Sequence, residues 1–159
     1  NFYEKLCQHH ELLLFEDYTE VRGWMNHLLD RVERLNRPCC LSHIDSVADN
    51  FLFLPDGTVR LIDWEYSAMH DPLIGISMCS IYSYYDAEEL DRLLEVYLER
   101  IPTPEERIAT YAYAALGGFL WCLWAVFKST EGEEFGEYTI IMYHYAKQYY
   151  KRIARLFPD

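Results

Sequence analysis

The residues best placed to do chemistry lie in one short stretch, from position 43 to position 65. Its first part holds His43, Asp45 and Asn50 in the spacing His-x-Asp-x-x-x-x-Asn, and its last part reads Ile-Asp-Trp-Glu at 62–65. Phosphoryl transfer needs a carboxylate that orients the attacking hydroxyl, and hard oxygen ligands that hold Mg²⁺ against a triphosphate. Asp45, Asn50 and Asp63 supply such groups. The spacing alone also occurs by chance, because Asp and Asn are ordinary loop residues.

A β-hairpin between the two parts would bring them together. Segments 51–54 and 58–62 are rich in apolar and β-branched residues, and Asp56-Gly57 between them is a tight-turn signal. A two-stranded hairpin folds back on itself, so the residues before its first strand meet those after its second. We therefore expect Asp45, Asn50 and Asp63 to converge at one mouth, which favours a catalytic site over a chance match.

The rest of the sequence predicts helices that can support this site. Apolar residues at three- and four-residue spacings predict helices over 15–35, ended by Pro38, and over about 86–101, capped by its first residue. A capping box at Thr103, with proline next, starts a helix that runs to about 128. A last helix is expected over about 136–156. The layout is one mainly α (α+β) domain over 1–159, with its strands confined to one small hairpin.

Composition limits the classes of molecule that this protein is expected to bind. Asp plus Glu outnumber Lys plus Arg by 26 to 14, a formal net charge of −12. Such a surface repels phosphate backbones and anionic lipids, so we expect neither nucleic acid nor a membrane as a partner. No apolar run approaches the length of a spanning helix. The five cysteines are odd in number and lack a CxxC spacing, which is typical of reduced thiols in a cytoplasmic protein.

The stretch at 43–66 resembles the catalytic and metal loops shared by protein kinases, aminoglycoside phosphotransferases and choline kinases. Ile-Asp-Trp-Glu-Tyr at 62–66 stands where protein kinases have Asp-Phe-Gly. The nearest likeness is to the choline and ethanolamine kinases, especially the bacterial choline kinases, and it covers about Leu41 to the C-terminus. The resemblance implies the helical C-terminal lobe of the protein-kinase-like fold and transfer of the ATP γ-phosphate to the hydroxyl of choline or ethanolamine.

The resemblance also implies a role for each residue and two cofactors, ATP and Mg²⁺. Asp45 would be the catalytic base, and His43 would brace its loop. Asn50 and Asp63 would bind Mg²⁺, while Glu65 would touch either the metal or the substrate ammonium.

One position departs from the family pattern. These kinases carry an Asp that supports the catalytic loop, and Gly75 stands at that place here. We expect loop support to be weakened, unless Asp71 takes over.

An aromatic pocket for a quaternary ammonium is also expected. Such a group cannot donate a hydrogen bond, so aromatic faces and carboxylates must hold it. Trp121 and Trp124 are three residues apart and share a helix face, although aromatic residues at this spacing usually belong to a core. Their resemblance to the choline-pocket segment of choline kinases, with Phe135 after them, favours a cage. Tyr66 is a further wall, and Tyr84 another, with Tyr82 and Tyr85 as alternatives. Tyr138 and Tyr143 are expected to pack on neighbouring helices.

Three parts of such a kinase are missing from this sequence: a glycine-rich phosphate loop, a strand lysine and its helix glutamate partner. We expect the ATP-binding N-terminal lobe to be absent from this chain, and the chain alone to be inactive. Two rival functions remain open. One is phosphorylation of an aminoglycoside or another amino alcohol, and the other is a non-catalytic binding domain. The oligomeric state is left open too.

Overall fold

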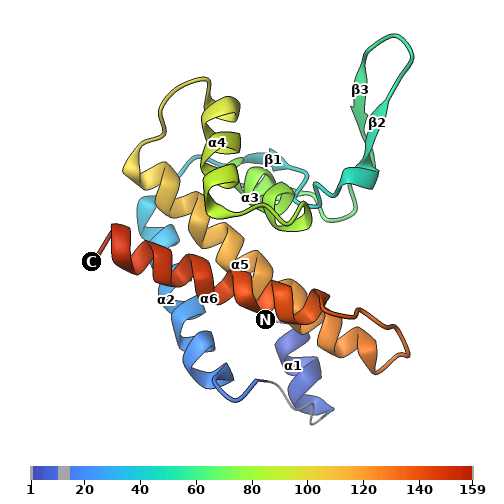
Figure 1. Ribbon diagram of the computed structural model, residues 1–159, viewed down its shortest axis with the longest axis vertical. Helices are drawn as coiled ribbons and strands as arrows, with labels where there is room; N and C mark the ends of the chain where they lie inside the picture. Colours follow the sequence, from blue (N-terminus) through green and yellow to red (C-terminus); the bar gives the residue numbers. More distant parts are fainter. Residues whose placement is uncertain (1, 11–14, 159) are drawn as a thin grey trace.

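The computed structural model describes residues 2–10 and 15–158. In that part of the chain, long helices form the body and a small hairpin projects from it (Figure 1). The elements in order are α1 (Phe2–His9), α2 (Tyr18–Leu35), β1 (Cys40–Ser42), the 3₁₀ helix η1 (Ala48–Asn50), β2 (Phe51–Phe53), β3 (Val59–Leu61), β4 (Ala68–His70), α3 (Leu73–Tyr82), α4 (Ala87–Leu98), α5 (Pro104–Ser129) and α6 (Tyr138–Leu156).

Helix α5 is the centre of the core. It packs along most of its length against α6 and also against α1, α2 and α3. The small residues of α5 allow this close approach: a Cβ on Gly118 would lie 2.6 Å from the backbone oxygen of Met142, and one on Gly117 would meet Met78. By length and composition α5 is the one described helix that could cross a membrane, contrary to the expectation from sequence. However, 72% of its apolar window is buried inside the fold, as in the core helix of a globular protein.

The two helix starts that were predicted from caps are confirmed, whereas the helix expected from position 15 begins at Tyr18. The Asp86 carboxylate accepts hydrogen bonds from the backbone of Glu88 and Glu89 at the start of α4. At the start of α5, Thr103 and Glu106 form a reciprocal capping box. The predicted helix ends are accurate to about three residues. These signals succeed because a cap is made by residues close in sequence.

The strands form two ribbons, so the expectation of a single hairpin was incomplete. Strands β2 and β3 form the predicted hairpin, with Phe51 opposite Leu61. A second antiparallel ribbon pairs β1 with β4, with Leu41 opposite Met69. Its strands have three residues each, too few to show an alternating pattern in the sequence. This ribbon closes the base of the segment that contains the expected catalytic residues.

Candidate active site

The loop after β1 fixes the Asp45 side chain. Asn50, at the end of η1, is buried, and its Nδ2 donates to the backbone oxygen of Asp45 at 2.9 Å and to the Oδ2 of Asp45 at 3.2 Å. Because Nδ2 faces Asp45, the Oδ1 of Asn50 points away from Asp45. The spacing of five residues matters here, because a single turn of 3₁₀ helix returns Asn50 to the start of the loop.

The two ends of the β2–β3 hairpin meet as expected. The backbone N–H of Ile62 donates to the carbonyl of Asn50 at 3.0 Å, and His43 Nε2 donates to the carbonyl of Ile62 at 2.7 Å. His43 also packs edge-on against Trp64, with ring centroids 4.9 Å apart. These contacts join the loop containing Asp45 to the residue just before Asp63.

Two of the five non-glycine residues with positive φ in the described part of the chain lie at this junction. Ile44 and Asp63, each next to a bonded residue of the junction, have φ values of +69° and +60°. A β-branched residue in this region is a genuine outlier, and strained positions of this kind cluster at functional sites. The bonds made by His43 and Asn50 hold both residues in this conformation.

Three carboxylates share one neighbour. The pKa of Tyr66 is raised by burial first, and then by negative charge on Glu65, Asp45 and Asp63 among its neighbours. The side chain of Asp63 is exposed, so it is free to bind a ligand. The structure thus brings the residues predicted for acid–base chemistry and for metal binding to one mouth.

The donor set is sparse for a metal ion. Within residues 2–10 and 15–158, no three His, Cys, Asp or Glu side chains lie close enough together to hold one. Asn50 and Asp63 offer two oxygen donors on one side. That arrangement fits Mg²⁺, which keeps several waters and takes further oxygens from substrate phosphates rather than requiring an all-protein cage.

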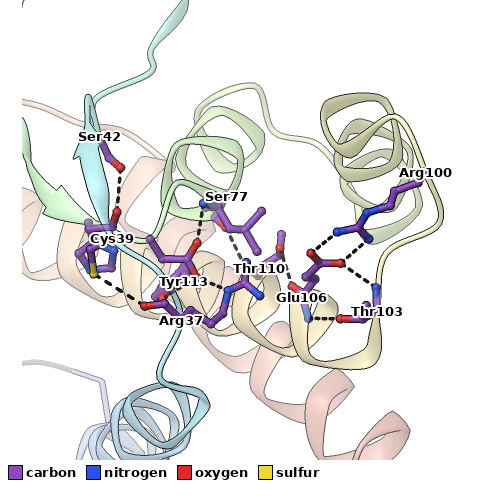
Figure 2. A network of polar contacts seen from close by, with 12 residues as sticks. Arg37, Cys39, Ser42, Ser77, Arg100, Thr103, Glu106, Thr110 and Tyr113 are labelled. Atoms are coloured by element: carbon purple, nitrogen blue, oxygen red, sulfur yellow. Dashed lines mark hydrogen bonds and ion pairs between the residues drawn. The ribbon is translucent and has the colours of Figure 1, made fainter.

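Asp71 is buried and braces the start of α3. Its partners Arg37 and Tyr113 are labelled in Figure 2. Its carboxylate pairs with Arg37 Nε at 2.5 Å, and it accepts from the Tyr113 hydroxyl at 3.3 Å and from the backbone N–H of Leu73 at 3.1 Å. Arg37 lies just before β1, so this cluster connects α3 to the strand that leads into the Asp45 loop.

A second contact supports the loop where the family aspartate is missing. The Ser46 hydroxyl, one residue after Asp45, donates to the carbonyl of Gly75 at 2.7 Å. A backbone oxygen at position 75 therefore makes a contact to the loop that needs no carboxylate.

Aromatic rings from two helices and two loops gather at the same mouth. Trp121 on α5 is the hub: its ring centroid lies 6.0 Å from Tyr66, 6.0 Å from Tyr82 and 5.6 Å from Trp124. Trp124 in turn contacts Phe135, at 5.0 Å. Trp121 is buried and Trp124 half-buried, so the pair belongs partly to the core and partly to an accessible wall. Four of the five expected pocket residues therefore form one connected aromatic cluster.

Tyr84, the fifth, does not share a ring contact with that cluster among those found in the described residues. It is 55% exposed, has a φ of +56° and follows the end of α3. Tyr82, left as an alternative from the sequence, contacts Trp121 instead. The last turn of α3 directs Tyr82 inward, and the helix ends before Tyr84. The end of α3 decides which tyrosine contacts the cluster. No glycine cap follows Tyr82 to mark that end, so the sequence carries no signal for it.

Two buried polar atoms near Asp45 lack a hydrogen-bond partner in the described structure, namely the Tyr82 hydroxyl and the Trp121 Nε1. The pKa of Tyr82 is raised far above its ordinary value, by burial first and then by the charge on Asp45, while Trp121 opposes the shift. The hydroxyl is therefore close to Asp45 without forming a well-aligned bond to it. A polar ligand group here would satisfy donors that are otherwise costly to bury.

Tyr138 also lies by the mouth rather than only between helices. Its ring is 6.2 Å from that of Phe135, and its pKa is raised by burial and by the charges of Tyr84 and Asp45. Tyr143 does pack as expected, stacked on Phe15 at 3.8 Å with its hydroxyl on Asp17 at 2.8 Å.

Comparison with known proteins supports this picture. A model of the phosphotransferase enzyme family matches residues 2–109. Protein LicA from Haemophilus influenzae is 34% identical over 114 residues, which is 68% of this chain and 41% of LicA.

Solved structures give a wider match. The choline kinase LicA from Streptococcus pneumoniae superposes with a TM-score of 0.78 at 32% identity, covering 94% of this chain and 52% of that one. A choline/ethanolamine kinase family protein from Mesorhizobium loti reaches 0.73 at 22% identity, over 99% and 53%, and so shares the fold. The chain spans about half the length of these relatives. It has the helical architecture of the C-terminal lobe of the kinase-like fold, and it belongs to the phosphotransferase enzyme family.

Proposed function

We propose that this chain forms the catalytic and substrate-binding lobe of an ATP-dependent kinase that phosphorylates choline or a closely related amino alcohol. The observation that supports this most is the position of Asp45 near Tyr66 and Tyr82, two rings of the aromatic cluster centred on Trp121. Asp63 also lies near Tyr66. A carboxylate next to aromatic faces suits a substrate with a hydroxyl at one end and a quaternary ammonium at the other.

In this proposal Asp45 accepts a hydrogen bond from the substrate hydroxyl and directs its oxygen toward the γ-phosphorus. A new oxygen–phosphorus bond forms as the bond to the β-phosphate oxygen breaks, and the hydroxyl proton leaves by way of Asp45. Asn50 keeps the Asp45 carboxylate in place through its Nδ2. His43 keeps the two loops joined through the Ile62 carbonyl.

Asn50 and Asp63 would hold Mg²⁺, which neutralises charge on the phosphates of ATP when bound. Glu65 is exposed next to them, and its role is either at the metal or near the ammonium. The remaining contacts to ATP are assigned to protein beyond this chain, because relatives about twice as long share this half. A LicA structure has been solved with AMP, which supports nucleotide binding in the family. We propose a cytoplasmic location, because the cysteines are free in the structure and their odd number without a CxxC spacing is typical of reduced thiols.

Trp121, Trp124, Tyr66 and Phe135 would surround the trimethylammonium, with Tyr82 at the end nearest Asp45. A cation against aromatic faces in a desolvated site is stabilised by about 2 kcal/mol or more. Tyr84, at the exposed rim, would contact the substrate only as it enters.

The experiment is a steady-state ADP-release assay on the protein at the full length of its gene. Its substrates are choline, ethanolamine, kanamycin and the uncharged tert-butyl analogue of choline. We expect choline to have the highest kcat/KM and the tert-butyl analogue a KM at least about tenfold higher, because it has the shape of choline without the charge. Equal KM values for choline and the analogue would rule out the cationic cage. A preference for kanamycin would support an aminoglycoside kinase instead, and no turnover of any of the four would support a non-catalytic binding domain.

A further inference from the structure

A second hollow lies behind the active site, between α2, α3, α5 and β4. It has a volume of about 280 Å³ and opens to the surface beside Leu29, which is 47% exposed. Its wall is mostly apolar, formed by side chains that include Leu29, Val32, Ile74, Met78, Leu116 and Leu120.

The hollow is separate from the proposed substrate pocket but borders it. Ile44, the residue before Asp45, forms part of its wall, and Trp121 another part. Tyr66, Trp124 and Phe135 do not line it. A molecule bound here would therefore contact the back of the catalytic loop without entering the mouth that contains Asp45.

Two side chains of the wall, those of His70 and Trp121, each have a buried polar atom without a hydrogen-bond partner in the described part of the chain. In His70 this atom is Nδ1. Its ring packs edge-on against Tyr113, at 5.2 Å, whose hydroxyl already donates to Asp71. An imidazole nitrogen in an apolar wall is costly to leave unpaired. A ligand hydroxyl or N–H would give it a partner.

Size and charge define the class of ligand. An apolar cavity of about 150 Å³ binds benzene, so this larger space has room for an aromatic ring with a short alkyl substituent. Glu33 also lines the hollow, and the chain as a whole carries a net charge of −12. Both disfavour an anionic head group.

We propose that this hollow is a binding site for a small uncharged molecule: an aromatic or compact apolar group with one hydroxyl or N–H that pairs with His70. Apolar pockets with few convergent polar groups are the usual form of small-molecule sites. The proposal does not depend on the kinase activity.

The test is calorimetric titration of the full-length protein with para-propylphenol and with para-propylbenzoate, which has the same apolar part but a negative charge. We expect saturable binding of the phenol and at least about tenfold weaker binding of the benzoate, because the carboxylate loses hydration without gaining a cationic partner. Leu116→Phe fills the hollow and should remove phenol binding. Leu156→Phe, at a 46%-exposed position on α6, is the matched control and should not. If circular dichroism shows that Leu116→Phe does not fold, Leu120→Phe replaces it.

His70→Phe tests the polar contact, because it keeps a ring against Tyr113 and removes Nδ1. It should weaken phenol binding about threefold to tenfold, the effect of one hydrogen bond, and leave binding of propylbenzene unchanged. The proposal is overturned if the phenol gives no saturable heat, which includes the case in which another part of the protein covers the hollow. Equal binding to the wild type and to the folded filled variant would also overturn it, as would equal affinity for phenol and benzoate.

Discussion

Aspartates at the two ends of this lobe have opposite surroundings. Where α4, α5 and α6 meet, Asp91 accepts from the Tyr111 hydroxyl at 2.5 Å and pairs with Arg107 at 2.7 Å and Arg152 at 3.3 Å. At the mouth, Asp45 bonds only to Asn50 among the described side chains, with the unpaired Tyr82 hydroxyl nearby. The Asp91 carboxylate is fully paired, whereas the Asp45 carboxylate can still accept hydrogen bonds from a ligand.

The difference extends to the backbone. The N-terminal ends of α4 and α5 are satisfied by capping boxes, and the positive φ of Glu99 is that of an ordinary helix C-cap. Ile44 and Asp63, by contrast, have positive φ in loops beside the mouth. Strain and unpaired polar groups persist only where the surrounding structure is stable enough to impose them. The comparison shows that the packed helical core provides the stability that lets strained and unpaired groups persist at the mouth. Three substitutions test this division.

The largest effect is expected from Asp45→Asn. In the full-length protein it should lower kcat for choline at least about a hundredfold, the usual scale for a lost acid–base group, while the melting temperature stays within about 2 °C because no stabilising ion pair is broken. Kinetics and thermal melts measure the two effects. Asp49→Asn, an exposed neighbour on η1, is the control and should change neither. Full activity in Asp45→Asn would refute the catalytic assignment.

A smaller effect, on stability alone, is expected from Asp91→Ala. Removal of this carboxylate takes away the partner of Arg152 and leaves Arg107 with Glu95 alone. The free energy of unfolding should therefore fall by about 2 kcal/mol, with KM for choline unchanged. Urea unfolding measures the loss. The control is Glu95→Ala, which removes only a 3.2 Å exposed pair with Arg107 and should cost less than about 0.5 kcal/mol. A large rise in KM for Asp91→Ala would mean that core and mouth are not separable.

The smallest effect is a pH dependence at Glu106. Its hydrogen bond with Arg100 is the main cause that lowers the pKa of this carboxyl from 4.5 to about 2, and Figure 2 shows the pair at the start of α5. A lowered pKa in the folded state stabilises the fold above pH 4.5, and this contribution is lost as the pH falls toward 2. Since the Arg100 side chain is half exposed, solvent screening reduces the effect to about 1 kcal/mol.

Urea unfolding of the wild type and of Glu106→Gln measures it. The stability difference between the two should be greatest near about pH 6 and shrink toward about pH 3. Glu105→Gln, an exposed neighbour in the same turn, is the control and should show no such trend. A difference that grows on acidification would contradict the assignment.

Sequence signals were accurate for features that are made by residues close together in the chain. The Asp56-Gly57 turn specified the hairpin, and Thr103 specified the start of α5, because each feature is made by residues a few positions apart. The hairpin likewise indicated that the residues before its first strand meet those after its second. The resemblance to kinases then supplied the pocket residues, of which Trp121, Trp124, Tyr66 and Phe135 do cluster.

Features made by distant residues were not predictable. The pairing of β1 with β4 joins Cys40 to His70, and three-residue strands leave no periodic signal. The choice of Tyr82 over Tyr84 depended on where α3 ends, which packing against α5 determines. Support of the Asp45 loop by the Gly75 carbonyl could not be predicted either, because a backbone oxygen has no signature in the sequence.

By itself, then, the sequence determined the types of chemical group, their order and the local turns and caps that lead into them, since these depend on neighbours along the chain. The tertiary structure alone decided which of several tyrosines faces Asp45, how the loop is held without its usual aspartate, and that a hollow lies behind it. Each of these depends on side chains far apart in sequence whose contacts exist only once the helices have packed around α5.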